Sequence, residues 1–476
     1  MAVSDFTFFW HDYETFGRVP RRDRPAQFAG IRTDAQLNEV GQPVMHYCQP
    51  APDYLPDPES CLLTGILPQT CLERGLPEHA FAQAIERELA WPGTIGVGYN
   101  TIRFDDEVTR HLFWRNLMDP YAREWQNNCG RWDLLDVVRC TWALRPEGIE
   151  WPKHDDGRPS FKLEHLTAAN GLSHEAAHDA LSDVRATIGL ARLIQQKQPK
   201  LFEFCLKLRK KDAVLAEIGV GKPFLHVSGQ YGVERGCLAI VWPLAPHPTN
   251  KNELIVWDLS VDPRELFSLN AEIIRQRTFS KADELPEGMT RLPLRSIHIN
   301  KSPIVIGNLK TLTPAVAARW GLDLDQALRH AELAARQGAS MAGIWPDVFA
   351  RPPRDQAPDV DEDLYGGFLS KDDRHALDRL RALSPELLAE RRTGFEDPRL
   401  DELLFRYRAR NFPQTLSASD QERWQQLRVE RLHEGVGGGL SLQAFFDRID
   451  ALSETADERG EGILGALYDY AEQIAP

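Results

Sequence analysis

The stretch FTFFWHDYETFG, residues 6–17, decides the fold of the first part of the chain. Its aromatic and apolar run predicts a buried strand, and that strand carries Asp12 and Glu14. Residues two apart on a strand leave the same face. Two carboxylates on one face of a buried strand are costly unless a cation lies between them. An isolated pair of this kind is more often a pair of exposed turn residues, so the interpretation depends on further acids.

Two later stretches supply those acids. Asp105 lies in GYNTIRFDDEVTRHLFWRN (98–116), where GTIGVGYN (93–100) predicts a second strand and a helix begins at the acid. Asp183 lies in AHDALSDVRATIGLARLI (177–194), whose apolar spacing predicts a helix over 179–195. Converging carboxylates repel one another without cations, and hard oxygen ligands favour Mg2+ or Mn2+. The set therefore predicts a two-metal hydrolase that acts on a phosphodiester.

Two positions near these acids need separate reasoning. Asp105 and Asp106 both open the same expected helix, and either one suits an N-cap or a first-turn acid, so spacing does not choose between them. His178 lies five positions before Asp183 and cannot share its helical face, whereas Asp179 is placed to cap the helix. The positive end of the helix dipole lowers the pKa of an imidazole there, and a neutral imidazole suits a general base.

Length and charge set broad limits on the protein. The chain has 476 residues, enough for two or three domains. Its formal net charge of −14 bears on solubility, whereas binding of nucleic acid depends on the local potential. Basic clusters within residues 18–24, 207–211 and 406–410 are expected to be solvated surface. The overall charge therefore does not decide whether a nucleic acid is the substrate.

Cysteine usage and hydropathy indicate a cytoplasmic protein. The seven cysteines are scattered and form no Cys-x-x-Cys pair, which favours reduced thiols. The chain has no apolar run of about 20 residues, so we expect no membrane span.

Three domains are expected along the chain. Residues 1–196 alternate strands and helices, which predicts an α/β fold with helices packed on a mixed sheet. Residues 197–350 begin with a basic amphipathic helix over 199–218 and continue with short apolar runs, typical of a small β-barrel. Residues 351–476 are expected to be helical after a linker, rich in proline and acid, over 351–367.

These motifs resemble a known superfamily. The order D-x-E, then N-x-x-x-F-D, then H-x-x-x-x-D resembles the DEDDh exonucleases, which have an RNase H-like core. Within them the chain resembles the bacterial exonuclease I family, and this resemblance covers nearly the whole chain. It implies an SH3-like middle domain and an α-helical C-terminal domain. The matching stretches are HDYETFG, RPAQFA, IRTD, GYN, IRFDDEVTR, RWDLLDV, ALRPEGI, HVSG, HINK and YRARNFP.

The resemblance implies an activity and assigns residues to it. The activity is processive 3′-to-5′ degradation of single-stranded DNA to 5′-mononucleotides, in DNA repair and recombination. The resemblance implies two Mg2+ ions per site, with Mn2+ as an alternative, and His178 as the general base. It also selects one acid of the Asp105–Asp106 pair, so that the implied metal ligands are Asp12, Glu14, Asp105 and Asp183.

A processive single-strand enzyme needs stacking surfaces and phosphate contacts that tolerate any sequence. For Trp125 and Phe161, core packing is an equally good interpretation. The family is expected to have arginine at the position of Lys162, and lysine lacks the bidentate fork of arginine. Near the expected nuclease pocket, the candidate substrate contacts are Glu14, Arg110, Tyr121, Trp125, Arg139, Phe161 and Lys162. From the middle domain, the candidates are His298, Asn300 and Lys301.

The resembling family also binds a protein partner. That partner is the acidic, Phe-ended C-terminal tail of single-stranded DNA-binding protein, which requires a basic rim beside an apolar pocket. The candidate residues are Arg145 and Phe204, with Lys207 or Arg209 nearby. We expect a monomer without a membrane partner.

Other functions are weighed against this one. A DEDDh exoribonuclease acting on RNA 3′ ends stays open, because the five residues report the reaction type and not the sugar. A non-catalytic binding protein is disfavoured, because a dead site is free to lose its ligands. The sequence has no H-E-x-x-H spacing and no G-x-S-x-G motif, which argues against a zinc enzyme and against a serine nucleophile.

Overall fold

The computed structural model describes residues 6–173, 179–350, 358–390 and 394–476. They form two compact units, and neither is continuous in sequence. The C-terminal region folds with the N-terminal region, so the units do not follow the expected boundaries at 196/197 and 350/351. The first unit combines Met1–Gly130, His174–Arg185 and Asp355–Pro476, and the second combines Arg131–Ser173 and Ala186–Arg354.

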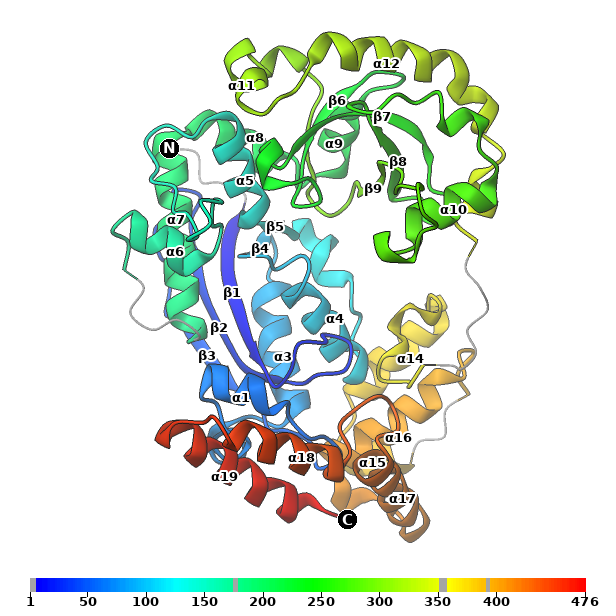
Figure 1. Cartoon of the computed structure of the whole chain (residues 1–476). Helices are drawn as coiled ribbons and strands as arrows, with labels where there is room; N and C mark the ends of the chain where they lie inside the picture. The colour runs from blue at the N-terminus through cyan, green and yellow to red at the C-terminus, as the bar shows by residue number, and fades with distance from the viewer. Residues whose placement is uncertain (1–5, 174–178, 351–357, 391–393) are drawn as a thin grey trace. The chain divides into compact units, whose positions relative to one another are not determined.

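A five-stranded mixed sheet carries the acidic strand. Its order is β3-β2-β1-β4-β5, with β1 at the centre (Figure 1). β1 pairs antiparallel with β2 and parallel with β4. The expected strands within 6–17 and 93–100 are confirmed. The strands are β1 (Thr7–Thr15), β2 (Pro25–Thr33), β3 (Val44–Tyr47), β4 (Thr94–Gly98) and β5 (Gly130–Asp133).

Helices surround this sheet. Phe9 and Tyr13 of β1 and Phe28 of β2 belong to one buried cluster with side chains of α3 and α4. Asp12 and Glu14 therefore leave the opposite face of β1, because side chains alternate along a strand. The helices are α1 (Pro58–Thr64), α2 (Pro68–Arg74), α3 (Glu78–Leu89), α4 (Asp105–Arg115), α5 (Leu134–Leu144), α6 (Leu163–Ala169) and α7 (Ala180–Lys197).

The second unit contains an antiparallel sheet of order β10-β6-β7-β8-β9. This order leaves β9 and β10 as edge strands. The strands are β6 (Phe224–Val227), β7 (Leu238–Pro246), β8 (Glu253–Asp258), β9 (Leu294–His298) and β10 (Ile304–Ile306). The accompanying helices are α8 (Pro199–Lys207), α9 (Lys211–Ile218), α10 (Ala271–Phe279), α11 (Pro314–Arg319), α12 (Leu324–Gln337) and α13 (Trp345–Val348).

The single helix expected over 199–218 is wrong, because the chain breaks into α8 and α9. Lys210 is extended, with φ −92° and ψ 125°, and precedes α9. Leu208 and Val214 are both fully buried. At about 100° per residue, six residues place two side chains on different sides of a straight helix. The break lets both side chains reach the core.

The C-terminal region is helical, as expected, and shares a core with the N-terminal part of the first unit. Phe445 of α18 and Leu467 of α19 lie in one buried cluster with Phe16, which directly follows β1. Helices α18 and α19 thus support the segment after the acidic strand. The helices of the C-terminal region are α14 (Lys371–Arg381), α15 (Pro385–Glu390), α16 (Arg399–Asn411), α17 (Ala418–Glu434), α18 (Leu442–Ser453) and α19 (Glu458–Ile474).

Part of the expected linker is a buried ion-pair site. Of residues 351–367, the structure describes 358–367, and Asp361 there is only 3% exposed. Its carboxylate accepts hydrogen bonds from Arg24, Arg410 and Arg431. Arg406 is also buried and pairs with Asp359. The expectation of a solvated 406–410 cluster is therefore wrong, because Arg406 and Arg410 and the acids within the expected linker neutralise one another inside the first unit.

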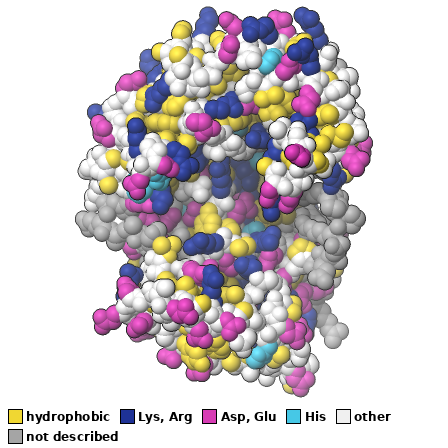
Figure 2. All heavy atoms as spheres, viewed as in Figure 1, with side chains coloured by type: hydrophobic (Ala, Val, Ile, Leu, Met, Phe, Trp, Pro, Cys, Tyr) yellow, Lys and Arg dark blue, Asp and Glu magenta, His cyan; other side chains and the backbone are white. Residues whose placement is uncertain are grey.

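The surface charges and the thiols agree more closely with the expectations from the sequence. Figure 2 shows acidic and basic side chains interspersed over the visible face, so the net charge of −14 does not make that face uniformly acidic. All seven cysteines are buried free thiols. Across the described residues, the helices include none with both the length and the apolar character of a membrane span.

Candidate active site

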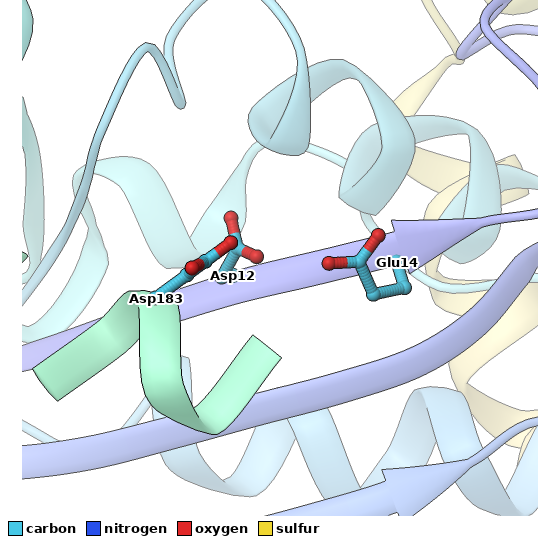
Figure 3. A group of neighbouring side chains, drawn as sticks. All are labelled: Asp12, Glu14 and Asp183. Carbon is cyan, nitrogen blue, oxygen red and sulfur yellow. The ribbon is translucent and has the colours of Figure 1, made fainter. Parts of the chain in front are cut away.

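Three carboxylates from two elements meet in the first unit (Figure 3). Asp12 and Glu14 project from one face of β1, and Asp183 projects from the first turn of α7. One oxygen from each of the three lies within 4.8 Å of the others. The structure therefore brings together acids that are separated by 169 to 171 positions in the sequence, counted from Asp183 back to Glu14 and Asp12.

Asp105 adjoins this group from the start of α4. The backbone N–H of Tyr13, between the two acids of β1, donates to Asp105 Oδ1 at 3.1 Å. The hydroxyl of Thr109 donates to the backbone carbonyl of Asp105 at 2.8 Å, which fixes the first turn of the helix. Asp106 instead accepts from Arg123 Nη2 at 2.5 Å in a fully buried ion pair. The structure thus gives Asp105 and Asp106 different partners, whereas their spacing in the sequence could not distinguish them.

Burial and mutual repulsion perturb the acids. Burial raises the pKa of Glu14 to about 8, with further increases from Asp183 and Asp105. Burial also raises the pKa of Asp12 well above its ordinary value, and Asp105, Glu14 and Asp183 add to the increase. Carboxylates that destabilise one another in this way are stabilised by a cation placed between them. The oxygen donor set fits a divalent metal ion.

The start of α7 is tied to the sheet and to its own first turn. Asp179 caps the helix, because its Oδ2 accepts from the backbone N–H of Ser182 at 3.1 Å. Gln27 of β2 accepts from the backbone N–H of Ala180 at 3.2 Å. Gln27 is not among the site residues predicted from the sequence, although a polar residue inside the apolar stretch PAQFAGI is a usable signal. His178 lies outside the described residues.

Matches to known sequence families cover most of the chain. Residues 9–191 match a family described as "Exonuclease", residues 209–351 match the exonuclease I SH3-like domain, and residues 358–474 match the exonuclease I C-terminal domain. The exodeoxyribonuclease I of Haemophilus influenzae is 45% identical over 477 residues, covering 99% of each chain. The chain belongs to the exodeoxyribonuclease I family.

Solved structures of exonuclease I agree with this fold. The exonuclease I of Methylocaldum szegediense is 48% identical, with a TM-score of 0.94, over 98% of this chain and 99% of that one. The Escherichia coli exonuclease I in complex with a dA16 oligonucleotide is 43% identical, with a TM-score of 0.93, over 99% of this chain and 100% of that one. The expected combination of an exonuclease core, an SH3-like domain and a helical C-terminal region is confirmed.

The candidate DNA contacts of the first unit differ in their environment. Trp125 is 67% exposed, so core packing does not explain it. Arg110 is buried and pairs with Glu124 and Glu107, and its guanidinium lies 5.3 Å from the ring centroid of Tyr121. In this exonuclease Arg110 is thus held by carboxylates and supports the aromatic ring.

The candidates of the second unit also fall into different classes. Lys162 is exposed and lies 3.5 Å from Glu164. Phe161 packs edge-on against Trp142, with the ring centroids 5.2 Å apart, so part of its surface serves packing. Arg139 pairs with Asp136 at 2.6 Å.

Three further candidates follow one another at the end of β9. His298 is the last residue of the strand and lies 3.8 Å from Glu253. Burial lowers its pKa, which favours a neutral ring. Asn300 is exposed, and Lys301 is half-buried.

The candidate partner-binding residues lie on two helices of the second unit that pack together, α5 and α8. Arg145 follows α5 and donates to the carbonyl of Leu144 at 2.5 Å. Phe204 is a half-buried residue of α8. Lys207 is 65% exposed and pairs with Glu203 at 3.1 Å.

Proposed function

We propose that this exonuclease hydrolyses the 3′-terminal phosphodiester of single-stranded DNA, releases 5′-mononucleotides, and repeats the step processively in DNA repair and recombination. The cluster of Asp12, Glu14 and Asp183 carries the proposal, because it fits a divalent ion and lies in a chain of the exodeoxyribonuclease I family. Structures of relatives in complex with single-stranded oligonucleotides support the choice of substrate.

We further propose Mg2+ as the cofactor, two ions per site, with Mn2+ as an alternative. Asp12, Glu14, Asp105 and Asp183 would hold the ions, directly or through water. The chemistry that bound Mg2+ supplies is activation of the attacking water and stabilisation of the leaving 3′ oxygen. A zinc-bound form of the E. coli complex has been solved, and an assay of nucleotide release with Mg2+, Mn2+ and Zn2+ tests the metal preference.

The protein's own groups would perform the remaining work. His178 would accept the proton of the attacking water as the general base, a role worth about 10²–10⁴-fold in rate. The N–H of Tyr13 orients Asp105. The arrangement requires the acids to be ionised, which the ions favour and which mutual repulsion opposes.

End-labelled substrates test this function. A 3′-labelled single-stranded oligonucleotide is expected to lose its label at once in the presence of Mg2+, while a 5′-labelled one shortens slowly. Omitting Mg2+ should stop both reactions. RNA of the same sequence is expected to resist; rapid loss of an RNA 3′ label, with DNA left intact, would instead establish the exoribonuclease alternative.

We propose that sequence-tolerant groups of this exonuclease contact the DNA strand. Trp125 offers an exposed ring for stacking, which is worth about 1–3 kcal/mol per base. Tyr121, Phe161, Lys162, Arg139, Asn300 and Lys301 are proposed as additional contacts, and Arg110 acts through Tyr121. His298 lines a cavity of about 830 Å3 in the second unit. That cavity is also lined by three arginines that fit a polyanion: Arg275, Arg291 and Arg295.

Substitution of Lys301 tests the proposed DNA contact of the second unit. Lys301→Ala is expected to weaken binding of single-stranded DNA and to reduce the slope of log K against log salt by roughly 0.7 to 1, because one phosphate contact is lost. The control is Lys281→Ala, an exposed lysine of the same unit that pairs with Glu284. An unchanged slope for Lys301→Ala in a fluorescence-anisotropy titration would remove this residue from the contact set.

We also propose that single-stranded DNA-binding protein is a partner of this exonuclease. A solved structure contains SSB with exonuclease I. Arg145 and Phe204 are proposed to receive the acidic, Phe-ended tail, with Lys207 or Arg209 at the rim. The seven free thiols support a cytoplasmic setting.

A further inference from the structure

Gln27 is a buried amide beside the acidic cluster. It is 2% exposed and lies in β2, whose other described positions are mainly apolar. In the antiparallel pairing of β1 and β2, Gln27 stands directly opposite Glu14. Directly opposite residues share one face of the sheet, with Cβ atoms about 4.5–5.5 Å apart. Gln27 therefore projects from the face that carries Asp12 and Glu14.

Gln27 connects this face to α7. Its Oε1 accepts from the backbone N–H of Ala180, the first residue of the helix, at 3.2 Å. The first N–H groups of a helix have no partner within the helix and need one elsewhere. Asp179 satisfies the N–H of Ser182, and Gln27 satisfies that of Ala180. Asp183 lies three residues further on, within the same first turn.

The charges in the cluster oppose this arrangement. Oxygens of Asp12, Glu14 and Asp183 lie within 4.8 Å of one another. Carboxylates this close repel one another when no cation lies between them, which favours separation of the first turn of α7 from β1. The hydrogen bond from the N–H of Ala180 to Gln27 resists that separation. It holds the start of α7 beside the residue of β2 that pairs with Glu14.

We propose that Gln27 is a positioning residue, which holds the start of α7 against the sheet so that Asp183 meets Asp12 and Glu14 at metal-binding distance. The proposal rests on the proposed function, since it takes the three acids as metal ligands. Residues that orient metal ligands typically change metal affinity or activity by about 10–100-fold when they are substituted. Gln27 does not contact the reacting atoms in this role.

Metal titration tests the proposal directly. Mn2+ binding to the metal-free full chain would be measured by calorimetry for the unsubstituted protein and for Gln27→Met. Gln27→Met keeps the size of the side chain but leaves the N–H of Ala180 without its acceptor, so Mn2+ should bind about 10–100-fold more weakly. High Mn2+ should restore kcat in Gln27→Met, with KM for DNA unchanged.

A control on the same strand separates positioning from general stability. Thr33 is fully buried in β2 and accepts from Trp10 Nε1 at 2.9 Å. It lies about 20 Å along the strand from Gln27, at roughly 3.3 Å per residue. Thr33→Val loses a comparable buried hydrogen bond and should leave Mn2+ affinity unchanged. Gln27→Asn, whose shorter side chain does not reach Ala180, replaces Gln27→Met if the latter fails to fold.

The outcomes distinguish this proposal from the proposed function. If Gln27→Met destabilises the protein as Thr33→Val does, but binds Mn2+ like the unsubstituted chain, Gln27 is only structural and the proposal is overturned. If the unsubstituted chain shows no Mn2+ binding that Asp183→Ala removes, the metal cluster itself is wrong. Weaker Mn2+ binding in Gln27→Met, with unchanged binding in Thr33→Val, supports the positioning role.

Discussion

Replacing Asp183 or Asp12 by alanine is expected to reduce mononucleotide release in Mg2+ by more than about 10⁴-fold, while binding of single-stranded DNA is retained. Loss of a general base typically costs about 10²–10⁴-fold, and loss of a carboxylate shared by the metal site should cost more because it displaces the ions. Release of labelled nucleotide measures turnover, and fluorescence anisotropy measures binding. Turnover equal to that of the unsubstituted chain would refute the assignment of the cluster.

The stability of the metal-free Asp183→Ala variant gives an independent control. Burial and neighbouring acids raise the pKa of Glu14 to about 8. A raised pKa in the folded state means that stability is fully present below the unfolded value near 4.5 and is lost as the pH rises through about 8. Asp183→Ala should therefore raise the melting temperature in EDTA above pH 8, although it abolishes activity. Asp156→Ala, at an exposed ion pair with Arg158, should change neither property.

The acids of the site could be predicted where local periodicity decides their geometry. The two-residue spacing of Asp12 and Glu14 fixes their common face, and the apolar pattern after Asp179 fixes the helix that carries Asp183. Spacing could not choose between Asp105 and Asp106, because the choice depends on Arg123, which neutralises Asp106 from outside the helix. A tertiary partner of this kind leaves no periodic signal.

β2 and Gln27 illustrate a second limit. Nearly every residue of β2 is buried, so the strand has no alternating pattern that would mark it in the sequence. The role of Gln27 depends on its pairing with β1 and on the position of α7, which are properties of the folded sheet. The stretch RPAQFA contributed only through its resemblance to a family.

The acidic stretch before α14 shows why charge alone was misleading. Proline and acid together predicted a linker, yet Asp361 is 3% exposed. Its partners Arg24 and Arg410 lie 337 and 49 positions away. Acidic residues are buried when arginines pair with them, and sequence separation on this scale hides the pairing.

The largest stability effect is expected at this buried network. Asp361→Ala removes the carboxylate shared by Arg24, Arg410 and Arg431. The remaining acids Asp53, Asp359 and Glu78 then compensate the buried arginine charges only in part. Breaking a buried pair by removing one partner costs about 3–5 kcal/mol. We expect a loss of that size in the free energy of unfolding, measured in urea. Asp450→Ala, at an exposed position on α18, should change it by less than about 0.5 kcal/mol.

The pH dependence of unfolding tests whether the charge of Asp361 causes this loss of stability. Burial alone would raise the pKa of Asp361, but Arg410, Arg431 and Arg406 outweigh it and hold the pKa well below its ordinary value. A lowered pKa contributes stability above the unfolded value of about 3.9, and this contribution is lost as the pH falls through the folded value. The unsubstituted chain should therefore lose stability below about pH 4 more steeply than Asp361→Ala does. Parallel acid-unfolding curves for the two proteins would show that the network stabilises this unit by packing and not by charge.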